Sequence, residues 1–274
     1  MSEFYNIAGI PVEIKGIDDP YFDYRLSAYQ SEKANAGSVI EYSESEKIDV
    51  PSGEKAGRDD YRIFLTNNGR YINYDILETP EMVTALVDAN EDWSSIKAKL
   101  CDVEPYGGAS LSVRSFNMIG EIMKYVFAKN NGILFSANSG TGKSTHTGLW
   151  EKVFKDNVEI INDDMPAVRK IDGGWKLCGT PWSGKSERNV NRIVPLKAIV
   201  FLERGEKNEI RRATSGESVF RIMNQTMLPV YKDIMGLVMD NIGEIISSVD
   251  TYVLKCTISE EAPEVVREKI FDEN

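Results

Sequence analysis

Apolar and polar residues alternate along the chain in two rhythms, a period of two near the N-terminus and helical spacing later. Residues 61–65 and 71–76 show the period of two that half-buried strands have, with turn-forming residues between them. Residues 34–60 contain few large apolar side chains, which predicts a mobile loop or a long exposed hairpin. The spacing becomes helical around residues 88–101 and again over residues 116–127.

From residue 132 onward, strands and helices are expected to alternate. Apolar residues 133–137 predict a strand, a glycine-rich loop follows, and residues 143–154 have helical spacing. A second apolar strand is expected at residues 158–162. The later elements expected are a hairpin turning at residues 172–174, strands at 198–202 and 251–256, and helices at 217–227, 230–239 and 262–271.

This order of elements predicts the fold class and the division of the chain. Alternating strands and helices are typical of an α/β protein in which helices cover a sheet. We expect a small β-rich N-terminal unit over residues 1–105 and an α/β core over residues 106–274.

Charge and composition exclude several classes of partner. The formal net charge is −11, and residues 1–100 carry 19 acidic against 10 basic side chains. No basic face that could displace counterions is visible, so nucleic acid is not expected as a partner. No signal segment and no apolar run long enough to span a membrane occurs, which predicts a soluble cytoplasmic protein without a membrane partner.

The metal- and proton-binding side chains are few. The three cysteines are far apart and form no zinc-binding pattern, so no zinc site is expected. His146 is the only histidine, which leaves little material for a multi-histidine metal site. It is expected to pack or hydrogen-bond on its helix beside Trp150, with contact to a substrate near the phosphates as the alternative. Proton transfer is therefore expected to use a carboxylate.

The strongest signal is the glycine-rich loop, whose residues 139–145 read Ser-Gly-Thr-Gly-Lys-Ser-Thr. Glycines let successive backbone N–H groups converge on a phosphate, and the helix N-terminus adds partial positive charge. Lys143 supplies a full charge, and Ser144 places a hydroxyl where a magnesium ion on the phosphates needs a ligand. The pattern predicts a nucleotide site.

The residues expected to bind the nucleotide are Asn138, Ser139, Gly140, Thr141, Gly142, Lys143, Ser144 and Thr145. The usual motif begins with a glycine, and Ala137 stands in its place, which weakens the match without removing the anion nest. An ordinary strand-to-helix turn is the alternative, and the flanking strand and helix disfavour it.

Two acidic residues, Asp163 and Asp164, follow the second apolar strand. The end of a strand beside a phosphate loop is where a magnesium ligand sits. One acid can hold the metal while the other accepts a proton from an attacking hydroxyl. A solvated turn is the alternative, and the position of the pair after the phosphate loop favours the catalytic interpretation.

A second glycine-rich segment at residues 179–188 carries two further candidates. Lys185 and Arg188 can steady a transferred phosphoryl group or an anionic substrate, because cations offset charge that develops on its oxygens. A loop with a few solvated charges explains the same residues equally well.

The loop at residues 139–145 together with the triplet at residues 162–164 resembles the superfamily of HPr kinase/phosphorylase and phosphoenolpyruvate carboxykinase. Residues 139–143 match the carboxykinase loop, and the short spacing to the paired acids resembles the HPr kinase core. The resemblance covers roughly residues 130–257. It implies a P-loop core with a mixed β-sheet flanked by helices.

The resemblance also implies ATP and Mg²⁺ as cofactors. It places Lys143 on the phosphates, Ser144 on magnesium and Asp163 as the base supported by Asp164, with both acids as candidate metal ligands. Two departures stand out. Members often carry a histidine in the strand before the loop, which residues 122–126 lack, and the acid that follows the loop serine in HPr kinase is Thr145 here.

We therefore expect an ATP- and Mg²⁺-dependent phosphotransferase that acts on a hydroxyl of a protein serine or of a small molecule. Two alternatives stay open: a carboxykinase-like enzyme acting on a keto acid, and a regulatory module that binds ATP without transferring phosphate. No guanine-reading Asn-Lys-x-Asp segment is present. The sequence carries no signal for an oligomeric state.

Overall fold

The computed structural model describes residues 2–33, 35–49, 54–56, 61–66, 69–74, 84–102, 110–135 and 142–272. Over these residues the chain is an α/β protein with mixed sheets and six α-helices. It divides into two compact units, one made of Met1–Asn130 with Pro229–Ile234 and the other of Asn131–Leu228 with Met235–Asn274.

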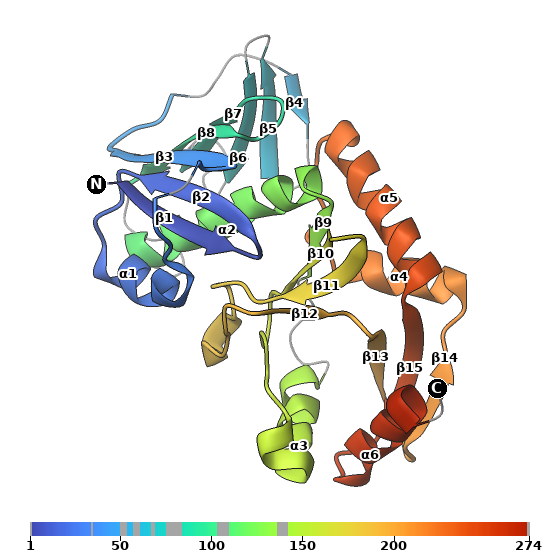
Figure 1. Ribbon diagram of the computed structural model, residues 1–274. Coiled ribbons are helices and arrows are strands. Elements are labelled where there is room, and N and C mark those ends of the chain that lie inside the picture. The colour runs from blue at the N-terminus through green and yellow to red at the C-terminus, as the bar shows by residue number, and fades with distance from the viewer. Residues whose placement is uncertain are drawn as a thin grey trace. The chain divides into compact units, whose positions relative to one another are not determined.

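The first unit is built on a mixed sheet of eight strands among the described residues. They are β1 (Ser2–Ile7), β2 (Ile10–Lys15), β3 (Ser38–Ser45), β4 (Glu54–Ala56), β5 (Tyr61–Thr66), β6 (Gly69–Tyr74), β7 (Ala85–Ala89) and β8 (Ser95–Cys101). Their order is β1-β2-β3-β8-β7-β6-β5-β4 (Figure 1). Strand β3 is parallel to both neighbours, and the other pairs are antiparallel.

The expectation of a loop or exposed hairpin over residues 34–60 was wrong for β3, which lies inside the sheet between β2 and β8. Its side chains alternate, and Ser38, Ile40 and Tyr42 face the core. Because one of these three buried positions is a serine, the segment carries little apolar signal. The Ser38 hydroxyl compensates by donating a hydrogen bond to the carbonyl of Trp93 at 2.9 Å.

The helix expected around residues 88–101 was also wrong, because β7 and β8 form an antiparallel pair there. Ile96, Ala98 and Leu100 are buried, and exposed residues separate them. That burial has the period of two of a half-buried strand. Small alanines at the alternate positions blurred the pattern in the sequence.

Helices α1 (Pro20–Leu26) and α2 (Leu111–Lys129) complete the first unit, with a 3₁₀ turn at Ser27–Tyr29 after α1. Helix α2 confirms the helical spacing predicted over residues 116–127. Its Phe116 makes an edge-on contact with Phe22 of α1, with ring centroids 5.7 Å apart.

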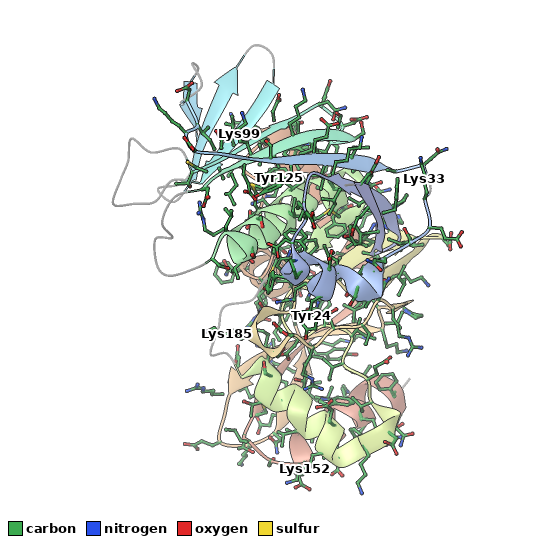
Figure 2. All side chains as sticks on the ribbon, turned by 90° about the vertical axis from the view of Figure 1, so that its left-hand side faces the viewer. Tyr24, Lys33, Lys99, Tyr125, Lys152 and Lys185 are labelled. Atoms are coloured by element: carbon green, nitrogen blue, oxygen red, sulfur yellow. The ribbon has the colours of Figure 1, made fainter. Side chains whose placement is uncertain are left out.

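The C-terminal half of α2 is held to the same unit by an aromatic stack. Tyr125, labelled in Figure 2, lies flat against Trp93 with ring centroids 4.1 Å apart. Because α2 packs with the first sheet, the compact unit ends after Asn130 and not at the predicted boundary between residues 105 and 106.

The second unit contains two smaller sheets and most of the remaining helices. Its elements are β9 (Gly132–Leu134), α3 (Lys143–Phe154), β10 (Ala167–Ile171), β11 (Gly174–Cys178), β12 (Ile193–Pro195), β13 (Ala198–Arg204), β14 (Glu209–Arg212), α4 (Ser215–Asn224), α5 (Lys232–Ser248), β15 (Asp250–Cys256) and α6 (Glu261–Arg267), with short turns of helix at Lys155–Asn157, Gly184–Ser186 and Glu268–Asp272. Helix α5 begins in the segment that belongs to the first unit.

The second sheet has the order β12-β11-β10-β9 and is antiparallel, and the third has the order β13-β15-β14. Strands β13 and β15 are parallel and in register from Ala198 with Asp250 to Arg204 with Cys256. Their carboxyl ends therefore meet at one edge of the third sheet.

Several sequence predictions for this unit are confirmed. Helix α3 begins and ends at the predicted residues, the hairpin β10–β11 turns at residues 172–173, and β13 and β15 occupy the two predicted strands. The strand expected at residues 158–162 was wrong. Only an isolated bridge joins Asn162 to Asn189, and β9 pairs with β10.

Helix α3 packs beside α6 at the third sheet (Figure 1). Trp150 of α3 lies against a core of Tyr252, Leu254, Val266 and Ile270. Lys152 of α3, labelled in Figure 2, forms an ion pair with Glu260 just before α6. Across the described parts of the chain, no helix is both long enough and apolar enough to cross a membrane.

Gly16→Ala tests how closely the first sheet is packed where β2 ends. Gly16 has φ +84°, and a Cβ there would lie 2.2 Å from the carbonyl oxygen of Tyr42. We expect the substitution to lower the free energy of unfolding by about 3 kcal/mol or more, measured by urea denaturation. The matched control is Gly173→Ala, where φ is +77° but no atom lies within 4 Å of the added Cβ. Its cost should stay near 1 kcal/mol, and equal losses would contradict the close approach.

Candidate active site

The N-terminus of α3 is open to an anion. Its N-cap is Gly142, whose φ of +92° is left-handed, and no side chain of the described residues caps the helix. No acidic residue lies in the first turn of the helix itself. Lys143 is the first helical residue and adds a full charge. This combination is suited to a phosphate group.

Ser144 and Asp163 meet beside this helix end. The Ser144 hydroxyl donates a hydrogen bond to Oδ2 of Asp163 at 3.1 Å. The other carboxylate oxygen, Oδ1, is buried and has no hydrogen-bond partner among the described residues. A buried oxygen without a partner is costly, so this atom is poised to bind a cation or a donor supplied by a ligand.

These oxygens can contribute to a magnesium site. Mg²⁺ prefers hard oxygen ligands and usually takes one or two carboxylates, completing its octahedron with waters and phosphates. The described part of the chain contains no cluster of three or more His, Cys, Asp or Glu that could hold a metal. Ser144 and Asp163 could supply a hydroxyl and a carboxylate ligand to such an ion.

Asn162 organises the turn that carries the two acids. Its Oδ1 accepts hydrogen bonds from the backbone N–H groups of Asp164 at 2.9 Å and Met165 at 2.7 Å. Its Nδ2 donates to the carbonyls of Thr180 at 2.8 Å and Trp182 at 3.2 Å. One amide thus fixes the acidic turn and ties it to the second glycine-rich segment.

Asp164 lies against that segment at Gly184. A Cβ on Gly184 would come within 2.8 Å of Asp164 Oδ2, and the φ of Gly184 is +63°. Only glycine allows the backbone to approach the carboxylate so closely. Gly179 is constrained in the same way, because a Cβ there would lie 1.8 Å from the carbonyl oxygen of Val190. The segment is therefore a built part of the site.

The two cations of this segment have different surroundings. Arg188 forms an ion pair with Glu151 of α3, and its carbonyl accepts a hydrogen bond from the N–H of Asp163 at 3.1 Å. It connects the loop to α3 and to the acidic turn. Lys185 follows Gly184 directly and is exposed, on the surface of the second unit in Figure 2.

His146 and Trp150 form a pair on one face of α3. The Trp150 indole N–H donates to Nε2 of His146 at 3.1 Å. The second ring nitrogen, Nδ1, is buried and has no partner among the described residues. Burial lowers the pKa of His146 below its ordinary value, which favours the neutral ring.

The predicted site residues fall into three groups. Asn138, Ser139, Gly140 and Thr141 lie outside the described residues. Gly142, Lys143, Ser144 and Thr145 form the start of α3, and Ser144 is brought to Asp163. Asp164, Lys185 and Arg188 belong to the acidic turn and the adjoining loop.

Sequence reasoning assigned no site role to three residues that shape this region. Asn162 was noted as part of a motif, and its amide hydrogen bonds depend on the path of a loop far along the chain. Glu151 pairs with Arg188, and Trp150 orients His146. The i, i+4 spacing of Trp150 and His146 was the one sequence signal for such a contact.

Searches of protein-family models, of curated proteins and of solved structures found no match to this chain.

Asn162→Ala tests whether this amide holds the acidic turn. The substitution removes hydrogen bonds to both sides of the turn, so we expect the free energy of unfolding to fall by about 2 to 3 kcal/mol in urea denaturation. The control is Asn157→Ala, because Asn157 makes one exposed side-chain bond, to the carbonyl of Phe154 at 3.2 Å. Its effect should stay within about 0.5 kcal/mol. Comparable losses for both variants would refute the organising role of Asn162.

Proposed function

We propose that this protein is an ATP- and Mg²⁺-dependent phosphotransferase that moves the γ-phosphate of ATP to a hydroxyl of a protein serine or of a small molecule. The observation that carries the proposal is the hydrogen bond between Ser144 and Asp163 at the start of α3. It joins the phosphate-loop motif to the acidic motif, which are separate in sequence. The resemblance of both motifs to the HPr kinase superfamily supports the same reaction and a P-loop core.

The roles in nucleotide binding follow from charge and position. Lys143 and the N–H groups at the start of α3 bind the terminal phosphates. Ser144 and Asp163 hold Mg²⁺ through their oxygens, and Oδ1 of Asp163 is the buried oxygen that has no other partner among the described residues. When bound, the ion offsets negative charge on the phosphates.

The same contacts suggest different roles for the two acids. Because Asp163 accepts a hydrogen bond from Ser144, it is assigned as the metal ligand, and Asp164 is assigned as the general base. This reverses the order expected from the resemblance, which made Asp163 the base. Asp164 takes the proton of the acceptor hydroxyl, the acceptor oxygen bonds to the γ-phosphorus, and the bond from that phosphorus to the bridging oxygen of ADP breaks. The products are ADP and a phosphorylated acceptor.

Lys185 is assigned to steady the phosphoryl group during transfer. It follows Gly184, whose backbone touches the Asp164 carboxylate, and it is exposed. A cation next to the base can offset charge on the transferred oxygens without blocking the acceptor. Arg188 acts as a positioning residue, because its ion pair with Glu151 and its carbonyl bond to Asp163 connect the loop to α3.

Substitution of each acid by asparagine separates the two roles. We expect Asp163→Asn to weaken Mg²⁺-dependent binding of a non-hydrolysable ATP analogue by about tenfold in calorimetric titration, because one carboxylate charge on the metal is lost. Asp164→Asn should bind the analogue within about threefold of the unsubstituted protein. It should lower transfer from γ-labelled ATP to a panel of hydroxyl acceptors by about a hundredfold or more.

Two controls accompany this experiment. Lys143→Ala should abolish most analogue binding, and Asp172→Asn, at the exposed β10–β11 turn, should change neither binding nor transfer. Binding without transfer to any acceptor would favour a regulatory ATP-binding module. If the unsubstituted protein fails to bind the analogue, the proposal is wrong.

A further inference from the structure

A cavity of about 760 Å³ begins at Gly142, where the phosphate loop meets α3. One wall is the first two turns of α3, including His146 and Leu149, and the other is formed by the carboxyl ends of β13 and β15 with the residues that follow them. All of these elements belong to the second unit. Ligands of open α/β sheets bind outside the carboxyl ends of parallel strands, and the volume lies in the range of small-molecule sites.

The wall opposite α3 is suited to a flat apolar group. Leu202 near the end of β13 and Ile258 after β15 line the cavity together with Leu149 of α3. Ile258 is 82% exposed, which is high for a large aliphatic side chain. An apolar ring placed between these side chains would cover them.

One polar group in this cavity has a defined hydrogen-bonding direction. Because Nε2 of His146 accepts the Trp150 indole N–H at 3.1 Å, the proton of the neutral ring is on Nδ1. That Nδ1–H is buried and has no acceptor among the described residues. A buried donor without an acceptor is unfavourable, and because His146 lines the cavity, a ligand acceptor that reaches Nδ1 would satisfy it.

We propose that this cavity binds the purine base of the nucleotide, with His146 Nδ1–H donating to a ring nitrogen of the base. The inference rests on the proposed function, because the phosphates of the same nucleotide lie at the start of α3. A purine combines two apolar faces with acceptor nitrogens at its edge, which matches the leucine and isoleucine side chains and the oriented His146 donor. Further polar groups in the same lining come from Thr145, Glu203, Arg204 and Thr257. Trp150 is a positioning residue, because it fixes the tautomer and the orientation of the imidazole.

Cys256 provides a native reporter for occupancy of the cavity. It lines the cavity and is partly exposed, whereas Cys101 and Cys178 are 1% and 0% exposed. Burial raises the pKa of the Cys256 thiol, so its alkylation is best followed at mildly alkaline pH. The extent of modification is read on the Cys256 peptide by mass spectrometry.

In the unsubstituted protein, ATP and adenosine should each slow alkylation of Cys256 by about fivefold or more at saturation, because the base covers the thiol. Inorganic tripolyphosphate should compete with ATP for the phosphate loop without slowing alkylation. If ATP binds in a Lys143-dependent manner while alkylation of Cys256 is unchanged, the base lies elsewhere and this inference is overturned, although the phosphotransferase proposal stands. If ATP does not bind at all, both fall.

Substitutions at His146 test the oriented donor. His146→Phe keeps a ring but removes the donor, and should weaken ATP binding about tenfold while leaving tripolyphosphate binding unchanged. His146→Asn retains an N–H near the position of Nδ1 and should recover most of the affinity. Trp150→Phe removes the indole N–H together with one ring of the side chain, and its ATP affinity should lie between those of the two His146 variants. Equal losses for ATP and tripolyphosphate would indicate a general disturbance of α3 and overturn the role of His146.

Discussion

The amide of Asn162 fixes both acids at once, because it hydrogen-bonds to the turn that carries them and to the loop that faces them. No sheet ladder holds this turn, since Asn162 itself makes only an isolated bridge, to Asn189. This side chain, together with the hydrogen bond from the Asp163 N–H to the Arg188 carbonyl, sets where Asp163 meets Ser144 and where Asp164 meets Gly184. The geometry of the candidate site follows from that one turn.

Elements with strong local signals were predictable from the sequence. Helix α3 follows a glycine loop, α2 has long helical spacing, and the β10–β11 turn contains Asp172 and Gly173, so local chemistry and burial agree. The prediction missed strand β3 because Ser38 is one of its buried positions. It missed β8 because a small alanine separates the two larger buried residues of that strand. Their assignment depends on neighbouring strands that the sequence does not order.

The site residues also divide into those that the sequence predicted and those that it did not. Ser144, Asp163 and Asp164 were predictable because their chemistry depends on residue type and spacing within short motifs. Asn162, Glu151 and Trp150 were not assigned roles, because an amide, a carboxylate or an indole acquires one only when a distant loop or a neighbouring ring supplies its partner. The separate roles of the two acids could be assigned only from the contact between Ser144 and Asp163, for the same reason.

Helix α3 has no fully buried side chain, and exposed ion pairs at Glu151 and Lys152 help to hold it in place. Such pairs contribute little in water and are screened by salt. The helix is therefore expected to open locally at a lower free energy than the sheets it lies on. Part of any ligand's binding energy then goes into holding α3 in place, so affinity at this site is expected to depend weakly on ionic strength even for an uncharged ligand.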